Sequence, residues 1–178
     1  MKVEIKFGGL GGQGIITMGF ILANAAALYD GKECVFTQDY SAEARGGAST
    51  SEVIISDERI DYPHVENADY LVLMSTSAYR DYIHKLKDDG VLIIDQDLVQ
   101  VSEDEKRRIY RIPATKIAEQ LGNPIVANIV MLGFFTGVTK IISAEAMMRA
   151  IKDRVPKRFW EINEKAFSEG MKHAEKNV

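Results

Sequence analysis

The glycines of residues 9–14, which read Gly-Leu-Gly-Gly-Gln-Gly, are the residues whose spacing points most directly to chemistry. Gly9, Gly11 and Gly14 fit the pattern Gly-x-Gly-x-x-Gly, and the segment follows a strand pattern and opens a helical one. Such glycines let a ligand approach the backbone closely, and the helix N-terminus offers free N–H groups to an anion. The alternative is a tight turn that only permits close packing of helix and sheet, and the sequence leaves both interpretations open.

A second polar segment, residues 38–47, reads Gln-Asp-Tyr-Ser-Ala-Glu-Ala-Arg-Gly-Gly. Tyr40 and Arg45 place a large ring and a permanent cation in a loop that can bind an anion or contact a partner. An ordinary surface loop is the alternative. Asp39 is the nearest candidate for the acidic residue of a dinucleotide site, but no helical pattern follows it, and this fits a nicotinamide-binding half-domain poorly.

Further polar groups follow the predicted buried strands and open an apolar helix. Ser-Thr-Ser occupies residues 75–77, Asp-Gln-Asp occupies residues 95–97, and Asn128 stands at the start of the apolar helix. Ligands bind at the carboxyl ends of strands in open α/β sheets, so these groups are candidates. Helix capping and turn hydrogen bonds explain the first two sets equally well, and capping or a local hydrogen bond could occupy Asn128.

The catalytic and metal-binding motifs that this sequence lacks narrow its function. Cys34 is the single cysteine, so the chain alone can form neither an intrachain disulfide nor an iron–sulfur site of about four cysteines. His64, His84 and His173 are scattered without the spacing of a zinc site. There is no Gly-x-Ser-x-Gly, no phosphate loop ending in Gly-Lys-Ser/Thr and no Gly-Asp-Gly of a diphosphate–magnesium segment.

Composition places the chain among ordinary globular proteins. It has 178 residues, 46% of them apolar and 27% charged, which excludes a disordered tail, a collagen-like fibre and a disulfide scaffold. The net charge of 22 − 26 = −4 argues against nucleic-acid binding. No export signal or membrane span is evident, so we expect a cytoplasmic protein without membrane or nucleic-acid partners, and a single domain over residues 1–178.

The hydrophobic pattern alternates between strands and helices. Strands are predicted at residues 3–7, 34–37, 49–56, 70–74, 91–94 and 108–112, and helices at 15–30, 75–86, 114–121, 127–141, 143–152 and 156–176. The first strand, helix and second strand form a Rossmann-like βαβ unit, which implies a parallel pair. We therefore predict an α/β fold, with three α/β/α layers on a mostly parallel, mixed sheet.

These motifs together resemble a known family. Residues 9–14, the segment Tyr-Ser-Ala-Glu-Ala-Arg-Gly-Gly at 40–47, Val-Ile-Ile-Ser at 53–56 and Asn-Ile-Val-Met-Leu-Gly at 128–133 are similar to the gamma subunit of 2-oxoacid:ferredoxin oxidoreductases. The similarity extends over nearly the whole chain and is nearest to the 2-oxoglutarate branch, with the pyruvate, branched-chain and indolepyruvate enzymes as relatives. It identifies residues 1–178 as a pyruvate/ketoisovalerate oxidoreductase gamma-type domain.

The resemblance implies a non-autonomous subunit that is inactive alone. The complex oxidatively decarboxylates a 2-oxoacid, passes electrons to ferredoxin and forms an acyl-coenzyme A. Thiamine diphosphate and magnesium are then expected on the alpha and beta subunits, and iron–sulfur clusters on cysteine-rich chains such as a ferredoxin-like delta subunit. This chain would hold no cofactor by itself, although it could contact coenzyme A.

The predicted site contains no catalytic residue and no metal ligand. The expected cofactor contacts are Gly9, Gly11, Gly12, Gln13, Gly14, Arg45 and Asn128. A free-standing Rossmann-type nucleotide-binding oxidoreductase, with the glycine loop on the pyrophosphate and Asp39 on the ribose, is the main alternative. A stand-alone scaffold or interaction domain is a third.

Overall fold

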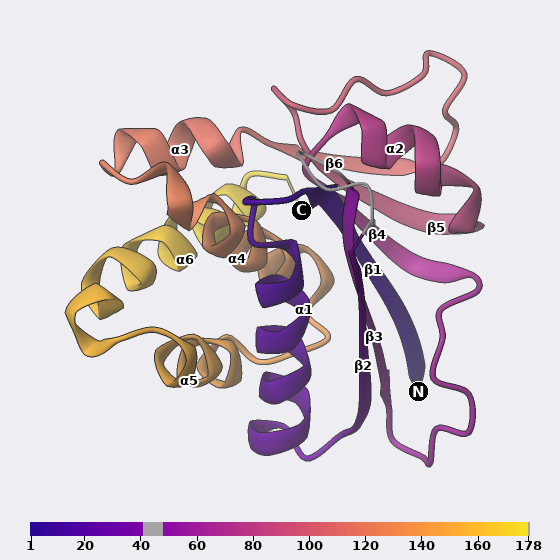
Figure 1. The fold of residues 1–178 in the computed structure, drawn as a ribbon, viewed down its shortest axis with the longest axis horizontal. Helices are drawn as coiled ribbons and strands as arrows, with labels where there is room; N and C mark the ends of the chain where they lie inside the picture. The colour runs from indigo at the N-terminus through magenta and orange to yellow at the C-terminus, as the bar shows by residue number, and fades with distance from the viewer. Residues whose placement is uncertain (41–47, 178) are drawn as a thin grey trace.

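A computed structural model describes residues 1–40 and 48–177, and in this part of the chain six strands form one sheet (Figure 1). They are β1 (Lys2–Leu10), β2 (Glu33–Tyr40), β3 (Ala48–Ser56), β4 (Ala68–Leu73), β5 (Leu86–Asp95) and β6 (Arg108–Ile112). Their order is β2-β3-β1-β4-β5-β6. The pairs β1–β4, β4–β5 and β5–β6 are parallel, whereas β3 runs antiparallel to both of its neighbours. The predicted mixed, mostly parallel α/β sheet is confirmed.

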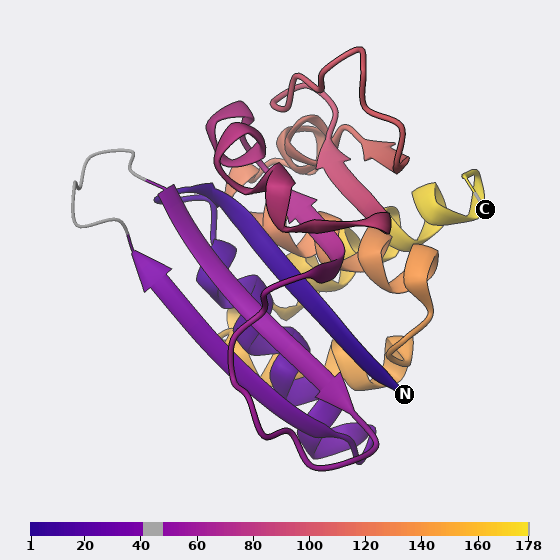
Figure 2. The same cartoon turned by 90° about the vertical axis from the view of Figure 1, so that its right-hand side faces the viewer.

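The predicted pairing of the first two strands is wrong, because β3 lies between β1 and β2 (Figure 2). β2 and β3 form an antiparallel hairpin, the usual outcome when a short connection joins two strands. β3 also extends β1 beyond the predicted strand end, since Gly8, Gly9 and Leu10 pair with Thr50, Ser49 and Ala48. The true glycine loop is therefore residues 11–14, and the first part of the predicted loop is strand.

Helices cover the two faces of the sheet unequally (Figure 1). Among the described residues, four helices lie on one face: α1 (Ile15–Asn24), α4 (Ala127–Thr139), α5 (Ala144–Arg154) and α6 (Trp160–Glu175), with α3 (Ala114–Gln120) beside them. The helix α1 continues as a π-helical turn over Ala25–Tyr29. The short α2 (Thr76–Tyr82) packs on the opposite face over β1 and β4. Two separate apolar clusters, one on each face, make the core, which confirms the three layers.

The apolar helix α4 is the centre of the larger cluster, as its sequence predicted. Residues 127–136 are all buried, and the Phe135 ring packs at a tilt against Phe7 of β1, with a ring-centroid distance of 6.0 Å. α6 crosses α4 at two glycines: a Cβ on Gly133 would lie 2.1 Å from the carbonyl oxygen of Phe167, and one on Gly170 would lie 2.0 Å from that of Val130. The absence of a side chain at both positions thus sets the distance between the two helices.

Asp89 and Gly90, a dipeptide typical of turns, lie within a strand in the structure, so the strand predicted at 91–94 begins earlier. β5 begins at Leu86 and runs through this pair, with an irregularity in its register against β4. The segment 99–107 contains no helix. Within the described residues, no helix combines the length and the apolar character that crossing a bilayer requires.

Candidate functional site

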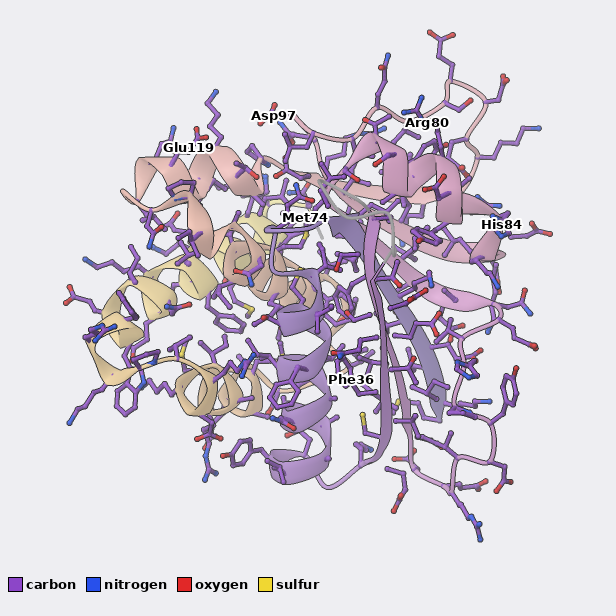
Figure 3. The ribbon with its side chains drawn as sticks, viewed as in Figure 1. Phe36, Met74, Arg80, His84, Asp97 and Glu119 are labelled. Atoms are coloured by element: carbon purple, nitrogen blue, oxygen red, sulfur yellow. The ribbon has the colours of Figure 1, made fainter. Side chains whose placement is uncertain are left out.

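The glycine loop lies at the edge of the sheet where the parallel strands end. The loop follows β1, and Met74 and Asp97 follow β4 and β5 at the same edge (Figure 3). The amide N–H of Met74 donates to the carbonyl oxygen of Gly8 at 2.9 Å, which joins the ends of β4 and β1. The carboxyl ends of parallel strands are where α/β proteins bind their ligands, so this edge is the candidate site.

Gln13 shapes the loop from inside. Its Oε1 accepts a hydrogen bond from the Leu10 N–H at 2.7 Å, and its Nε2 donates to the Met74 carbonyl oxygen at 2.8 Å. Its side chain therefore bridges β1 and β4 within the chain. Gly9 is required by the same arrangement, because a Cβ there would lie 2.5 Å from Oε1 of Gln13 and 2.7 Å from Cδ1 of Ile15.

The left-handed positions of the loop are Gly12 and Gly14, with φ of 92° and 74°. Gly14 caps α1, and a Cβ on it would lie 2.4 Å from Nδ2 of Asn128. That nitrogen donates to the Gly14 carbonyl oxygen at 3.3 Å. The structure thus brings Asn128 of α4 to the loop, as a tertiary hydrogen bond rather than as a helix cap.

Two hollows open beside the loop and meet at Gly12 and Ile125. One of about 310 Å³ combines apolar side chains with uncharged polar ones; it is lined by Gly12, Gly14, Thr17, Asn123, Ile125, Val126, Asn128, Ile129, Val155, Phe159, Ile162 and Asn163. The other, of about 120 Å³, lies between Gln13, Leu98 and Thr115. We refer to the first as the amide cleft, because amide groups of Asn128 and Asn163 line its wall.

The amide cleft contains residues that the sequence analysis missed. Asn163 is 5% exposed, and its Nδ2 donates to the Phe159 carbonyl oxygen at 2.8 Å. The sequence feature that could have identified Asn163 is its position as an amide within the apolar stripe of α6. In the sequence, Asn123 belongs to an Asn-Pro pair, which predicts a turn. That pattern gives no indication that Asn123 lies near the glycine loop.

The polar groups that follow β4 and β5 have the structural roles of caps and turns. Oγ of Ser75 accepts a hydrogen bond from the Ala78 N–H at 3.1 Å and caps α2. Asp95 is fully buried, and its Oδ2 accepts from the N–H and the hydroxyl of Thr115 at 2.9 and 2.7 Å. These bonds attach the end of β5 to the start of α3, so capping accounts for both groups.

Asp39 does not occupy the position of a ribose-binding acid. It lies on β2, two strand spacings or roughly 10 Å from β1. Phe36 of β2 contacts Phe20 of α1 at a centroid distance of 6.0 Å, so the alternation of side chains puts Asp39 on the face away from α1. There it lines a polar hollow with Lys6 and Glu52. This geometry is unlike a dinucleotide site.

Arg45 and most of the segment 40–47 lie outside the described residues. Ala48, which follows this segment, pairs directly with Leu10 at the start of the glycine loop. The residue that directly follows segment 40–47 therefore lies beside the start of the glycine loop. A larger hollow of about 750 Å³ opens around Lys140, Ile142 and Met171 and is lined by none of the predicted site residues.

Cys34 is the chain's only thiol, and burial raises its pKa to about 11. The thiolate is the nucleophile, so we expect iodoacetamide at pH 8 to react on the order of 100-fold more slowly than with a free cysteine. Mass spectrometry of the folded chain, with the urea-unfolded chain as control, measures both rates. Equal rates in the two samples would contradict this account of the thiol.

Comparison with known proteins decides the family. The family model described as "Pyruvate ferredoxin/flavodoxin oxidoreductase" matches residues 4–173. The chain belongs to this family. A curated relative, the 2-oxoglutarate synthase subunit KorC of Methanocaldococcus jannaschii, is 53% identical over 173 residues, which cover 96% of this chain and 92% of the relative.

Two solved structures have the same fold. The gamma subunit of a keto/oxoacid ferredoxin oxidoreductase from Geobacter sulfurreducens is 41% identical with a TM-score of 0.90, covering 99% of this chain and 98% of that one. A 2-oxoglutarate:ferredoxin oxidoreductase from Magnetococcus marinus, solved with 2-oxoglutarate, coenzyme A and succinyl-CoA bound, is 25% identical with a TM-score of 0.87. The match covers 98% of this chain but 31% of that longer chain.

Proposed function

We propose that this chain is the gamma subunit of a multisubunit 2-oxoacid:ferredoxin oxidoreductase whose preferred substrate is 2-oxoglutarate. The complex would oxidatively decarboxylate the 2-oxoacid to an acyl-coenzyme A and pass the electrons to ferredoxin. The observation that carries the proposal is the 53% identity to a KorC subunit over nearly the full length of both chains. The geometry at Asp39 removes the support for a free-standing dinucleotide-binding oxidoreductase.

The chemistry of the reaction would reside on other subunits. The sequence holds one cysteine, too few for a cluster, and among the described residues no group of three or more His, Cys, Asp or Glu side chains could hold a metal ion. Thiamine diphosphate and magnesium would accordingly be bound by the alpha and beta subunits, and iron–sulfur clusters by cysteine-rich chains. We infer that residues 1–178 are a single domain that completes this assembly in the cytoplasm.

The amide cleft and the glycine loop are the parts of this chain that we assign to the complex. The cleft combines apolar walls with amide groups, which suits the uncharged amide-bearing arm of coenzyme A and gives no cation for its phosphates. Gly11, Gly12 and Asn128 would border that arm, and Arg45 would contribute its cation from the neighbouring segment. Gly9 and Gln13 would act indirectly, by shaping the loop.

The isolated chain is expected to show no 2-oxoacid oxidation. An affinity-tagged copy, expressed at its native level, should recover the remaining subunits, and that complex should reduce a viologen dye with 2-oxoglutarate and coenzyme A. The purified chain alone is the matched sample in the same assay. Sustained turnover by the isolated chain, or failure to recover any partner together with absence of activity, would refute the proposed function.

A further inference from the structure

An exposed apolar ridge borders the amide cleft. It consists of Leu98 after β5, Ile125 in the turn before α4 and Phe159 in the turn before α6, with exposed fractions of 37%, 78% and 40%. Ile125 stands between the two hollows beside the glycine loop and lines both. Gly12 lines the same two hollows as Ile125, and a Cβ built on Gly12 would have no neighbouring atom within 4 Å. We call these residues the Ile125 ridge.

The backbone holds Ile125 rigidly in its exposed position. Oδ1 of Asn123 accepts a hydrogen bond from the Ile125 N–H at 3.1 Å, and Pro124 fixes φ at the first position of a 3₁₀ turn. The N–H groups of Asn123 and Val126 donate to the carbonyl oxygens of Ala118 and Asn123 at 3.1 and 3.2 Å. A large aliphatic side chain held out by a rigid turn is already arranged for burial by a partner, at little further cost in entropy.

A basic rim flanks the ridge on the α5–α6 side. Arg154, Lys157 and Arg158 are exposed, and no carboxylate of residues 1–40 or 48–177 lies within 4.0 Å of their charged nitrogens. Arg158 lies over the Phe159 ring at 4.8 Å, so its charge adjoins the ridge. An apolar centre bordered by polar and charged side chains is the usual anatomy of a protein interface.

We propose that the Ile125 ridge and its basic rim are the surface by which this chain binds another subunit of the oxidoreductase complex, one that presents an apolar socket flanked by Asp or Glu side chains. This inference rests on the proposed function. The Magnetococcus marinus enzyme supports the choice of another subunit as the partner. The region that matches this chain makes up 31% of that polypeptide, so in that enzyme the corresponding domain is covalently joined to the rest of the chain.

The charge distribution argues against a second copy of this chain as the partner. A two-fold contact places the same patch on both sides of the interface, so the three cations of one rim would approach those of the other. A small ligand in one hollow could not cover the whole ridge, because Phe159 lines only the larger hollow and Leu98 lines only the smaller one. A subunit with a complementary acidic socket satisfies both the ridge and the rim.

The test measures binding of the purified chain to the remaining subunits, expressed together without it. Ile125→Gln is expected to weaken binding at least 10-fold, and Leu98→Gln to weaken it in the same direction. Leu28→Gln is the matched control, because Leu28 is an exposed aliphatic residue, 65% exposed, at the far end of α1. The thermal melting temperature of each isolated variant reports folding, and no change beyond about 2 °C is expected for these exposed positions.

The rim is tested by its dependence on salt. The double variant Lys157→Glu/Arg158→Glu should weaken binding at 50 mM NaCl and reduce the difference between 50 and 300 mM, whereas Lys106→Glu, an exposed lysine elsewhere, should do neither. If Ile125→Gln and Leu98→Gln bind the other subunits with affinities within twofold of wild type, the proposed docking surface is wrong, and the proposed function is unaffected. Wild-type chain that binds no subunit would overturn both proposals.

Two further outcomes would assign the surface to a different occupant and so overturn the proposal. A wild-type dimer in sedimentation that Ile125→Gln dissociates, with subunit binding unchanged, would identify a second copy. Loss of coenzyme A binding in the ridge variants, with subunit binding unchanged, would identify a small-molecule site.

Discussion

Gly170→Ala should destabilise the folded chain by about 3 kcal/mol, the largest effect we expect from adding a single methyl group. A Cβ at this position would lie 2.0 Å from the Val130 carbonyl oxygen and 2.7 Å from the Phe134 nitrogen. Both atoms belong to the backbone of α4, so no rotation of a side chain can relieve the overlap. The two helices must move apart, and the packing between them is lost.

Chemical denaturation followed by circular dichroism measures the effect of Gly170→Ala. Ser168→Ala, an exposed position on the same helix, is the control and should change the free energy of unfolding by less than about 0.5 kcal/mol. Equal stability of the two variants would show that α4 and α6 are not in the close contact described here.

Gly14→Ala should cost about 2 kcal/mol, because it combines two separate penalties. The residue has φ of 74°, a conformation that alanine rarely adopts, and its Cβ would overlap Nδ2 of Asn128 at 2.4 Å. Gly11→Ala is the control within the same loop, since Gly11 is not among the residues with positive φ. The requirement for a positive φ in this turn therefore falls on Gly12 and Gly14, not on Gly11.

A double-mutant cycle separates the two penalties of Gly14→Ala. In an Asn128→Ala background the overlap disappears and the backbone strain remains, so Gly14→Ala should cost about 1 kcal/mol there. The free energies of unfolding of the four proteins give the coupling between the positions. An unchanged cost in the Asn128→Ala background would show that Asn128 does not contact the cap of α1.

The types of most elements follow from local sequence, whereas the order of the strands does not. Alternation at residues 3–7 and the nearly all-apolar segment 127–136 predict a strand and a core helix, and both are present. The insertion of β3 between β1 and β2 depends on long-range pairing, such as Ile5 with Val53. No periodicity in either strand reports which strand will be its neighbour.

The candidate site was predictable in part for the same reason. The glycine spacing and the position of Asn128 before an apolar run are local features, and the fold brings them together. The inward use of Gln13 depends on the Met74 carbonyl oxygen, which lies 61 residues away in the chain. The exposure of Ile125 is likewise a property of the folded surface, because an isoleucine next to Val126 and Ala127 reads as core.

Substrate selectivity of the complex tests the central claim most directly. The complex recovered with the tagged chain is assayed for coenzyme A-dependent viologen reduction with 2-oxoglutarate, pyruvate and 2-oxoisovalerate under matched conditions. The account predicts the highest kcat/KM for 2-oxoglutarate, with turnover that requires the other subunits. A complex that contains this chain and oxidises none of the three 2-oxoacids, or that prefers pyruvate or 2-oxoisovalerate, would contradict it.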